Sequence, residues 1–283
     1  MRKNSLLAFL YRAIDTASQT RMSRKERGSA VRIDLAGRKA LVTGASTGIG
    51  RAIAIALARA GCDVAVGYRT SRQEAEEVAG LIRAAGRNTI VLEGDVALEE
   101  QARAVVEGAA SALGGLDILV NNAGSLIQRT PLTEADTQVW RRVMGTNLDS
   151  VYYCTKYALP YLRQSGAGRV INLGSIAGHT GGGPGAWHYA AAKGGVHTLT
   201  MGFARELAPY GITVNAVAPG VIDTPFHQRF SSEERMKQML SEVPLGRIGT
   251  PEDVAPLVVF LASDQASYIT GQVIAVNGGQ LMR

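Results

Sequence analysis

Tyr189 and Lys193 are the residues whose types and spacing most directly suggest chemistry. They lie four residues apart in a segment with helical spacing, which puts both side chains on one helix face. A free tyrosine has a pKa of about 10 and is a poor base near neutral pH. An ammonium about 4 Å away favours the phenolate by about 4 kcal/mol at an effective dielectric of about 20, and desolvation opposes part of that effect. We therefore expect Lys193 to bring the pKa of Tyr189 towards the working pH, where general acid–base catalysis is most efficient.

Two further polar residues stand where they could assist such a proton transfer. Ser175 comes just after the hydrophobic stretch 170–173, and a hydroxyl at the end of a parallel strand can hydrogen-bond a substrate oxygen. Asn147 interrupts a helical segment, although asparagine is a poor helix former. This misfit indicates a role such as holding a water in a proton relay to Lys193, the alternative being a tolerated polar residue.

A glycine-rich segment follows the first hydrophobic stretch and leads directly into a helical pattern. It reads Thr43-Gly44-Ala45-Ser46-Thr47-Gly48-Ile49-Gly50. Glycines let the backbone approach a pyrophosphate closely, and the helix start supplies unpaired N–H groups and a positive dipole end. Because strand, turn and helix stand in the required order, the segment predicts dinucleotide binding.

The end of the second hydrophobic stretch discriminates between the two nicotinamide cofactors. An acidic residue there would bond the ribose hydroxyls of NAD(H), whereas a basic residue would accept the 2′-phosphate of NADP(H). The sequence has Arg69 at this point, followed by Thr70 and Ser71, with no carboxylate before Glu74. Arg69 therefore favours NADP(H). NAD(H) stays possible if Arg69 is only a solvated loop residue.

The rest of the chain supplies elements that can position these residues. Seven short apolar segments are predicted strands: 40–42, 63–66, 89–92, 118–120, 169–173, 213–217 and 273–276. Six segments with helical spacing lie between them: 49–60, 72–85, 98–113, 139–162, 189–207 and 251–262. This alternation predicts an α/β fold, with one doubly wound domain, a seven-stranded parallel sheet and helices on both faces. The polar segment 221–250 breaks the rhythm and is expected to form a lid or binding loop.

The chain's net charge of +6 lies in its first residues. Residues 1–32 contain eight basic and two acidic side chains, so the other 251 residues carry 22 of each sign. The high pI is therefore no argument for nucleic-acid binding. We divide the chain into a basic, flexible extension (1–34) and a folded domain (35–283). The extension could be an organelle-targeting peptide or the result of an alternative start at Met22, but a disordered tail is the preferred interpretation.

Cysteine content and hydropathy favour a cytoplasmic protein. Cys62 and Cys154 are the only cysteines, and neither has a CxxC or histidine-rich context, so no disulfide framework or metal site is expected. No apolar stretch is long enough to span a membrane. We expect a reducing compartment.

Taken together, these segments resemble the single-domain type of the short-chain dehydrogenase/reductase family. The matching pieces span residues 35 to 280 and stand in the family's order. They are Thr43–Gly50, Asp95-Val96, Asn121-Asn122-Ala123-Gly124, then Asn147, Ser175, Tyr189 and Lys193, and finally Pro219-Gly220 with Thr224. One departure is the segment from Ser175 to Tyr189, which is about one residue longer than usual through Gly181-Gly182-Gly183.

The resemblance implies a Rossmann-like fold and a hydride transfer between a nicotinamide and a carbonyl or secondary alcohol. It assigns Tyr189 the proton transfer, Lys193 the lowering of the phenol pKa and a bond to the nicotinamide ribose, Ser175 the orientation of the substrate, and Asn147 the water relay. The implied cofactor-binding residues are Gly44, Ser46, Thr47, Gly48, Ile49, Gly50, Tyr68, Arg69, Thr70, Asp95, Val96, Asn122, Ala123, Gly124, Tyr189, Lys193, Pro219, Gly220, Val221, Ile222 and Thr224.

The substrate is a small carbonyl or alcohol compound whose identity the sequence leaves open. One interpretation is an NADPH-preferring ketone or 3-oxoacyl reductase, for which Arg129, Arg141 and Arg142 could meet an acidic carrier. The alternative is a glucose 1-dehydrogenase-like sugar or polyol dehydrogenase. The polar residues expected near the substrate are His179, Thr180, Trp187, His188, His227 and Gln228. A catalytically silent cofactor sensor on the same fold is a third possibility, disfavoured by the intact Ser175, Tyr189 and Lys193. The family also implies a homotetramer.

Overall fold

The computed structural model describes residues 33–282 of the protein. Nearly all of the predicted basic extension, and with it the targeting hypothesis for residues 1–32, lies outside the described residues. Residues Ile33–Arg283 group into one compact unit. Within residues 33–282, no helix combines the length and the apolar character that crossing a bilayer requires.

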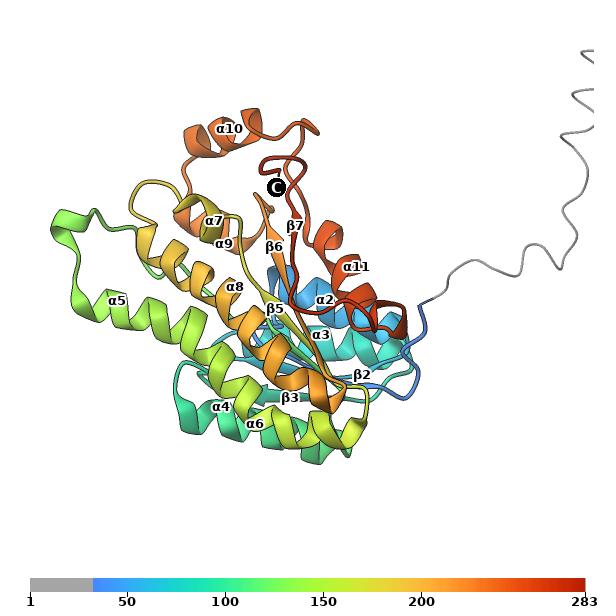
Figure 1. Ribbon diagram of the computed structural model, residues 1–283. Coiled ribbons are helices and arrows are strands. Elements are labelled where there is room, and N and C mark those ends of the chain that lie inside the picture. The colour runs from blue at the N-terminus through green and yellow to red at the C-terminus, as the bar shows by residue number, and fades with distance from the viewer. Residues whose placement is uncertain (1–32, 283) are drawn as a thin grey trace, which may run out of the picture. The chain divides into compact units, whose positions relative to one another are not determined.

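A seven-stranded parallel sheet forms the centre of this unit, which confirms the predicted fold class (Figure 1). The strands are β1 (Lys39–Val42), β2 (Asp63–Tyr68), β3 (Thr89–Glu93), β4 (Ile118–Asn121), β5 (Arg169–Leu173), β6 (Thr213–Pro219) and β7 (Val273–Val276). Their order is β3-β2-β1-β4-β5-β6-β7, so the winding direction reverses between β1 and β4. In doubly wound sheets a ligand crevice opens at such a reversal, beyond the carboxyl ends of the strands.

Alternating side chains of the strands divide the core into two clusters, one on each face of the sheet. Val42, Val64 and Val120 pack on one face, while Leu41, Ala65 and Leu119 pack on the other. The strands read as nearly continuous apolar runs because both faces are buried, as is usual for parallel sheets.

Ten α-helices lie among the described residues. They are α2 (Gly48–Arg59), α3 (Arg72–Ala84), α4 (Glu99–Leu113), α5 (Thr137–Met144), α6 (Ser150–Ser165), α7 (Ala177–Thr180), α8 (Trp187–Leu207), α9 (Pro225–Phe230), α10 (Glu233–Ser241) and α11 (Pro251–Leu261). Helices α2 and α11 pack together on one face of the sheet, and α4 and α6 pack together on the other (Figure 1). Short 3-10 turns occur at Leu132–Glu134, Ala208–Tyr210 and Asp264–Ala266.

The predicted helix over 139–162 differs from the structure in one respect. Five residues, Gly145–Asp149, form a π-helical turn (η3) between α5 and α6. The helical path continues through the turn, but its wider hydrogen-bonding pattern displaces the side chains locally. Turns of this kind are frequent at functional sites, and this one contains Asn147.

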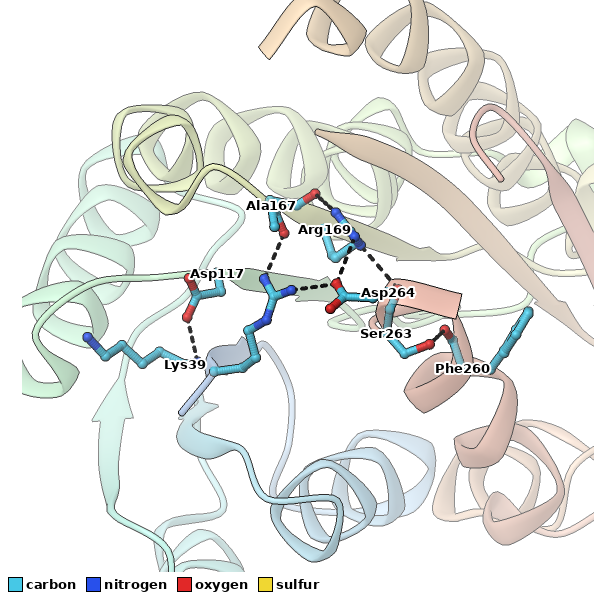
Figure 2. Close-up of polar contacts among 9 residues, drawn as sticks. Lys39, Asp117, Ala167, Arg169, Phe260, Ser263 and Asp264 are labelled. Carbon is cyan, nitrogen blue, oxygen red and sulfur yellow. Dashed lines mark hydrogen bonds and ion pairs between the residues drawn. The ribbon is translucent and has the colours of Figure 1, made fainter. Parts of the chain in front are cut away.

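A polar network connects segments at the amino-terminal end of the sheet, opposite the end where the crevice opens (Figure 2). Arg169, the first residue of β5, is buried and donates to the carbonyl oxygens of Gly168 (3.0 Å) and Ser263 (3.4 Å). Asp264 accepts from Arg169 (3.4 Å) and from Arg38 (2.7 Å). The network joins β5 to the segment before β1 and to the segment after α11. We assign it a role in stability because it lies away from the crevice.

Candidate active site

One large cavity of about 820 Å³ opens at the carboxyl ends of the strands. Every predicted catalytic or cofactor-binding residue except Asn147 lines it. The structure therefore brings together side chains from segments spread over 180 positions of the sequence, from Gly44 to Thr224.

The turn between β1 and α2 has the features of a phosphate cradle. Gly44 and Gly48 have positive φ angles, 61° and 55°, a conformation that favours glycine. A Cβ atom at Gly50 would overlap the carbonyl oxygen of Gly44 and the amide of Asn122. Helix α2 begins without a side-chain cap and without an acidic residue in its first turn. Its first N–H groups thus remain suited to an anion, and the turn fits a dinucleotide pyrophosphate.

Asn122 and Thr43 connect the ends of the two strands at the reversal point. The amide of Asn122 donates to the carbonyl oxygens of Thr43 and Gly44, both at 2.9 Å. The hydroxyl of Thr43 accepts from the backbone N–H groups of Asn122 (3.0 Å) and Ala123 (3.1 Å). These bonds fix the turn from the β4 side. Thr43 was not singled out from the sequence, although it is the first residue of the glycine-rich segment.

Arg69 lies at the end of the cavity where the sequence predicts the adenosine ribose. Its guanidinium is about half exposed and approaches Asp95 at 3.7 Å. Asp95 makes its closer ion pair, 2.5 Å, with Arg142 of α5. The acidic charge of Asp95 is therefore shared with Arg142, which leaves Arg69 with donors for a further anion. The hydroxyl of Tyr68 donates to Glu93 (2.8 Å), and Tyr68, Thr70 and Ser71 all line the cavity.

Tyr189 and Ser175 meet at the wall of the cavity. Tyr189 lies in the first turn of α8 and is half-buried, and Ser175 follows β5. Burial raises the pKa of Tyr189 to about 12, and a hydrogen bond from Ser175 offsets only part of that rise. The sequence-based expectation of a lowered phenol pKa is therefore not met, because burial dominates. The neutral phenol, which is the form that can donate a proton, dominates near neutral pH.

Lys193 stands one turn further along α8 and is buried. Its Nζ donates to the carbonyl oxygen of Leu173 at 2.6 Å and lies 5.7 Å from the centre of the Tyr189 ring. Burial lowers the pKa of Lys193 to about 8. Because Nζ hydrogen-bonds to backbone and lies at this distance from the ring, burial decides the pKa of the phenol.

Asn147 lies behind the cavity wall and is fully buried in the π-helical turn. Its Oδ1 accepts from the backbone N–H of Ser125 (3.1 Å), and its Nδ2 donates to the carbonyl oxygens of Ser125 (2.7 Å) and Val143 (2.9 Å). Asn147 thus connects the helix to the segment after β4, next to Gly124. A Cβ at Gly124 would come within 2.8 Å of Asn147 Oδ1 and 3.2 Å of Lys193 Nζ. Asn147 and Lys193 therefore flank the same backbone position.

The residues expected near the substrate separate into two groups. Thr180 and His227 line the cavity, whereas His179, Trp187, His188 and Gln228 do not. His179 packs against His197, Trp187 stacks on Trp140, and His188 is buried. Of the three arginines considered for a carrier, only Arg129 lines the cavity.

Several residues of the site were not found from the sequence. Phe226 packs against Tyr189 with ring centres 5.6 Å apart, and Arg235 of α10 reaches the cavity from the predicted lid. The polar composition of segment 221–250 was the one available signal, because motif spacing carries no information about a lid. Among residues 33–282, no group of His, Cys, Asp or Glu side chains is arranged to hold a metal ion.

The sequence of the chain is similar to those of known reductases. The family model described as enoyl-(acyl carrier protein) reductase matches residues 44–280. The 3-oxoacyl-[acyl-carrier-protein] reductase FabG of Staphylococcus aureus (strain Mu50 / ATCC 700699) is 46% identical over 245 residues, covering 87% of this chain and 98% of the relative.

The fold is also similar to solved structures of a dehydrogenase/reductase and a reductase. A dehydrogenase/reductase from Sinorhizobium meliloti 1021 aligns with a TM-score of 0.84 at 36% identity, covering 89% of this chain and 98% of that one. The NADH-dependent reductase A1-R′, responsible for alginate metabolism, aligns with a TM-score of 0.81 at 36% identity, covering 88% and 99%. The similarity thus extends over almost the whole described unit.

Proposed function

Because the chain belongs to the short-chain dehydrogenase/reductase family, an oxidoreductase family that uses a nicotinamide cofactor, we propose that it reduces ketones or 3-oxoacyl thioesters with NADPH. The observation that carries this proposal is the position of Tyr189. It lies on the wall of the cavity that the phosphate-binding turn also lines, beside Ser175, with its phenol in the neutral, proton-donating form.

We assign the chain's own residues the following roles. The turn 44–50 holds the dinucleotide phosphates, and Asn122 fixes the shape of that turn. Ser175 orients the substrate oxygen, and Tyr189 donates a proton to it. Lys193 stabilises the phenolate that proton donation leaves behind, and Asn147 positions the backbone next to Lys193. The nicotinamide, when bound, supplies the hydride.

The preference for NADPH rests on Arg69. It is the basic residue at the end of β2, it lines the cavity, and its closest carboxylate, Asp95, is already paired with Arg142. The similar reductase A1-R′ is named as NADH-dependent, so the family alone does not fix the choice. The test is a parallel titration of the purified protein with NADPH and NADH, followed by fluorescence. Tighter binding of NADPH supports the proposal, and tighter binding of NADH refutes it.

The 3-oxoacyl substrate class comes from the relative named as a 3-oxoacyl-[acyl-carrier-protein] reductase. The experiment is an assay of NADPH consumption with a 3-oxoacyl thioester, run beside NADP⁺ reduction with glucose and polyols. Faster turnover of the thioester supports the reductase assignment. Faster oxidation of the sugars would instead favour the dehydrogenase alternative.

We further propose a cytoplasmic homotetramer. Tyr152 on α6 and Met201 on α8 expose 43% and 45% of their surface, apolar area that a helix–helix interface could bury. Cys62 and Cys154 are both free and buried, as suits a reducing compartment. Light scattering of the full chain tests the tetramer, and a fluorescent fusion of residues 1–32 tests the location.

A further inference from the structure

Two arginines that the proposed mechanism does not use line the same cavity as Tyr189. Arg129 lies in the segment after β4, and Arg235 lies on α10. Neither makes an ion pair with a carboxylate of residues 33–282. The acidic residues that line the cavity are Asp95 and Glu242. Asp95 pairs with Arg69 and Arg142, and Glu242 accepts from Gln280.

Backbone contacts fix Arg129 in place. Its Nε donates to the carbonyl oxygen of Phe230 (2.7 Å), and its Nη1 donates to that of Pro184 (2.9 Å). These bonds connect the lid to the loop between Ser175 and Tyr189. The guanidinium keeps N–H donors on Nη1 and Nη2 beyond these two bonds, because it carries five in all.

Arg235 occupies a space that the glycine-rich loop leaves open. A Cβ atom at Gly183 would overlap Nη2 of Arg235. The absence of a side chain at Gly183 therefore leaves room for the guanidinium of Arg235. The Nε of Arg235 is buried and has no hydrogen-bond partner among the described residues. Leaving a charged donor unsatisfied costs more than leaving a neutral one unsatisfied.

Positive charge predominates at this end of the cavity, although the carboxylate of Asp223 acts on His227 in the opposite sense. Burial and the charge of Arg235 lower the pKa of Arg129. Burial, Arg129 and Arg235 lower the pKa of His227 to about 4, so His227 is neutral at physiological pH. The two arginines are close enough to repel each other, and no carboxylate lies between them. An anion bound there would offset this repulsion and accept hydrogen bonds from both guanidinium groups.

The path from this arginine pair to Tyr189 is apolar. Phe230, whose carbonyl accepts from Arg129, packs on Phe226 with ring centres 5.1 Å apart, and Phe226 packs on Tyr189. A molecule that reaches from the proton donor to the arginines therefore passes aromatic rings.

We propose that Arg129 and Arg235 bind an anionic group of the substrate, a carboxylate or a phosphate, separated from the reacting carbonyl by an apolar segment. This inference rests on the proposed reductase function, and it narrows the ketones among the proposed substrates to oxo acids or phosphorylated ketones.

The test compares matched probes, one with the anionic group and one in which that group is esterified or absent. The carboxylate pair is 4-oxopentanoate and its methyl ester, and the phosphate pair is dihydroxyacetone phosphate and dihydroxyacetone. Binding is measured by calorimetry on the full chain saturated with NADP⁺, which cannot reduce the probes. We expect the anionic member of at least one pair to bind about 10-fold more tightly or better, which corresponds to about 1.4 kcal/mol. The pair that shows the preference identifies the source of the anion.

Three variants locate the effect. Arg235→Met should abolish the preference, and Gly183→Ala should do the same by displacing the guanidinium, whose flexible end can move without disturbing the fold. Lys237→Met removes the same charge from an exposed position of α10 outside the cavity and should leave the preference intact.

Equal binding of charged and neutral probes by the wild-type chain overturns the inference. The inference is also overturned if Arg235→Met still binds the anionic probe more tightly than the neutral one. It is overturned as well if Arg235→Met weakens only the binding of NADPH. Turnover with NADPH is measured separately on all four probes and on a 3-oxoacyl thioester. Reduction without charge preference refutes the inference alone, whereas anion binding without any turnover refutes the reductase function alone.

Discussion

Lys193 Nζ lies 5.7 Å from the centre of the Tyr189 ring and donates to the carbonyl oxygen of Leu173 at 2.6 Å. The ammonium therefore lies beside the phenol while hydrogen-bonding to backbone. Burial then dominates both pKa values, raising that of Tyr189 to about 12 and lowering that of Lys193 to about 8. The arrangement favours proton donation by Tyr189, which is the reaction that a reductase requires.

The pH dependence of reduction follows from these two pKa values. Tyr189 stays protonated at every pH well below 12, so its ionisation does not limit ketone reduction near neutrality. Lys193 loses its proton as the pH rises through about 8. The positive charge that stabilises the phenolate left on Tyr189 after proton donation is then lost. We expect kcat/KM for a ketone at saturating NADPH to be constant from about pH 6 to 7.5 and to decline above about pH 8. A decline centred below pH 7 would show that the phenol itself titrates there.

Removal of the Arg69 guanidinium tests the discrimination between cofactors. Arg69→Ala should raise the Kd for NADPH by about 10- to 100-fold, equivalent to roughly 1.4–2.7 kcal/mol, and change the Kd for NADH little. Fluorescence titration with both nucleotides measures this. Arg83→Ala, at an exposed position of α3 away from the cavity, is the control. Equal losses for the two nucleotides would mean that Arg69 does not contact the 2′-phosphate.

Asn147 is expected to combine a structural and a functional effect. Asn147→Ala leaves the part-buried N–H and carbonyl of Ser125 and the buried carbonyl of Val143 without this partner, so the free energy of unfolding should fall by about 2–4 kcal/mol. Turnover should fall at least 10-fold because the backbone beside Lys193 shifts. Denaturant unfolding and steady-state kinetics measure the two effects.

Ser150→Ala is the control because it removes one bond to Thr146 in the same region. It should lower the free energy of unfolding by about 1 kcal/mol and leave turnover near normal. Wild-type turnover in Asn147→Ala would limit the residue to a role in stability.

The strands and the placement of Tyr189 and Lys193 on one helix could be predicted from the sequence because their signals are local. The seven apolar segments and the Tyr189–Lys193 spacing depend only on neighbouring residues, and the structure places them as expected. The π-helical turn at Asn147 could not be predicted, because two of the three bonds of that side chain join it to Ser125, 22 positions away. The position of the Arg235 side chain in the cavity could not be predicted either, because it depends on Gly183 in a different segment. The phenol pKa was misjudged because burial is a tertiary property.

The network at the amino ends of the strands gives a prediction about stability alone. Arg169→Met keeps most of the buried apolar stem but removes the donors to Ser263, Gly168 and Asp264 (Figure 2). The free energy of unfolding should fall by about 2–3 kcal/mol, while kcat/KM measured well below the melting temperature should not change. Arg38→Met, whose side chain is partly exposed, should show a smaller effect of the same kind. A change in kcat/KM without a loss of stability would contradict a purely structural role.

The measurement that tests the central claim most directly is NADPH-dependent reduction of a 3-oxoacyl thioester by the wild-type chain and by Tyr189→Phe. The variant removes only the hydroxyl that we assign to proton donation, so NADPH binding should persist within about 3-fold while turnover falls by about 10³-fold or more, at the lower end about 4 kcal/mol of transition-state stabilisation. Turnover in the wild type that disappears in Tyr189→Phe, with cofactor binding retained, is the predicted result. Comparable turnover in the two proteins would show that another group carries the proton and would contradict the account.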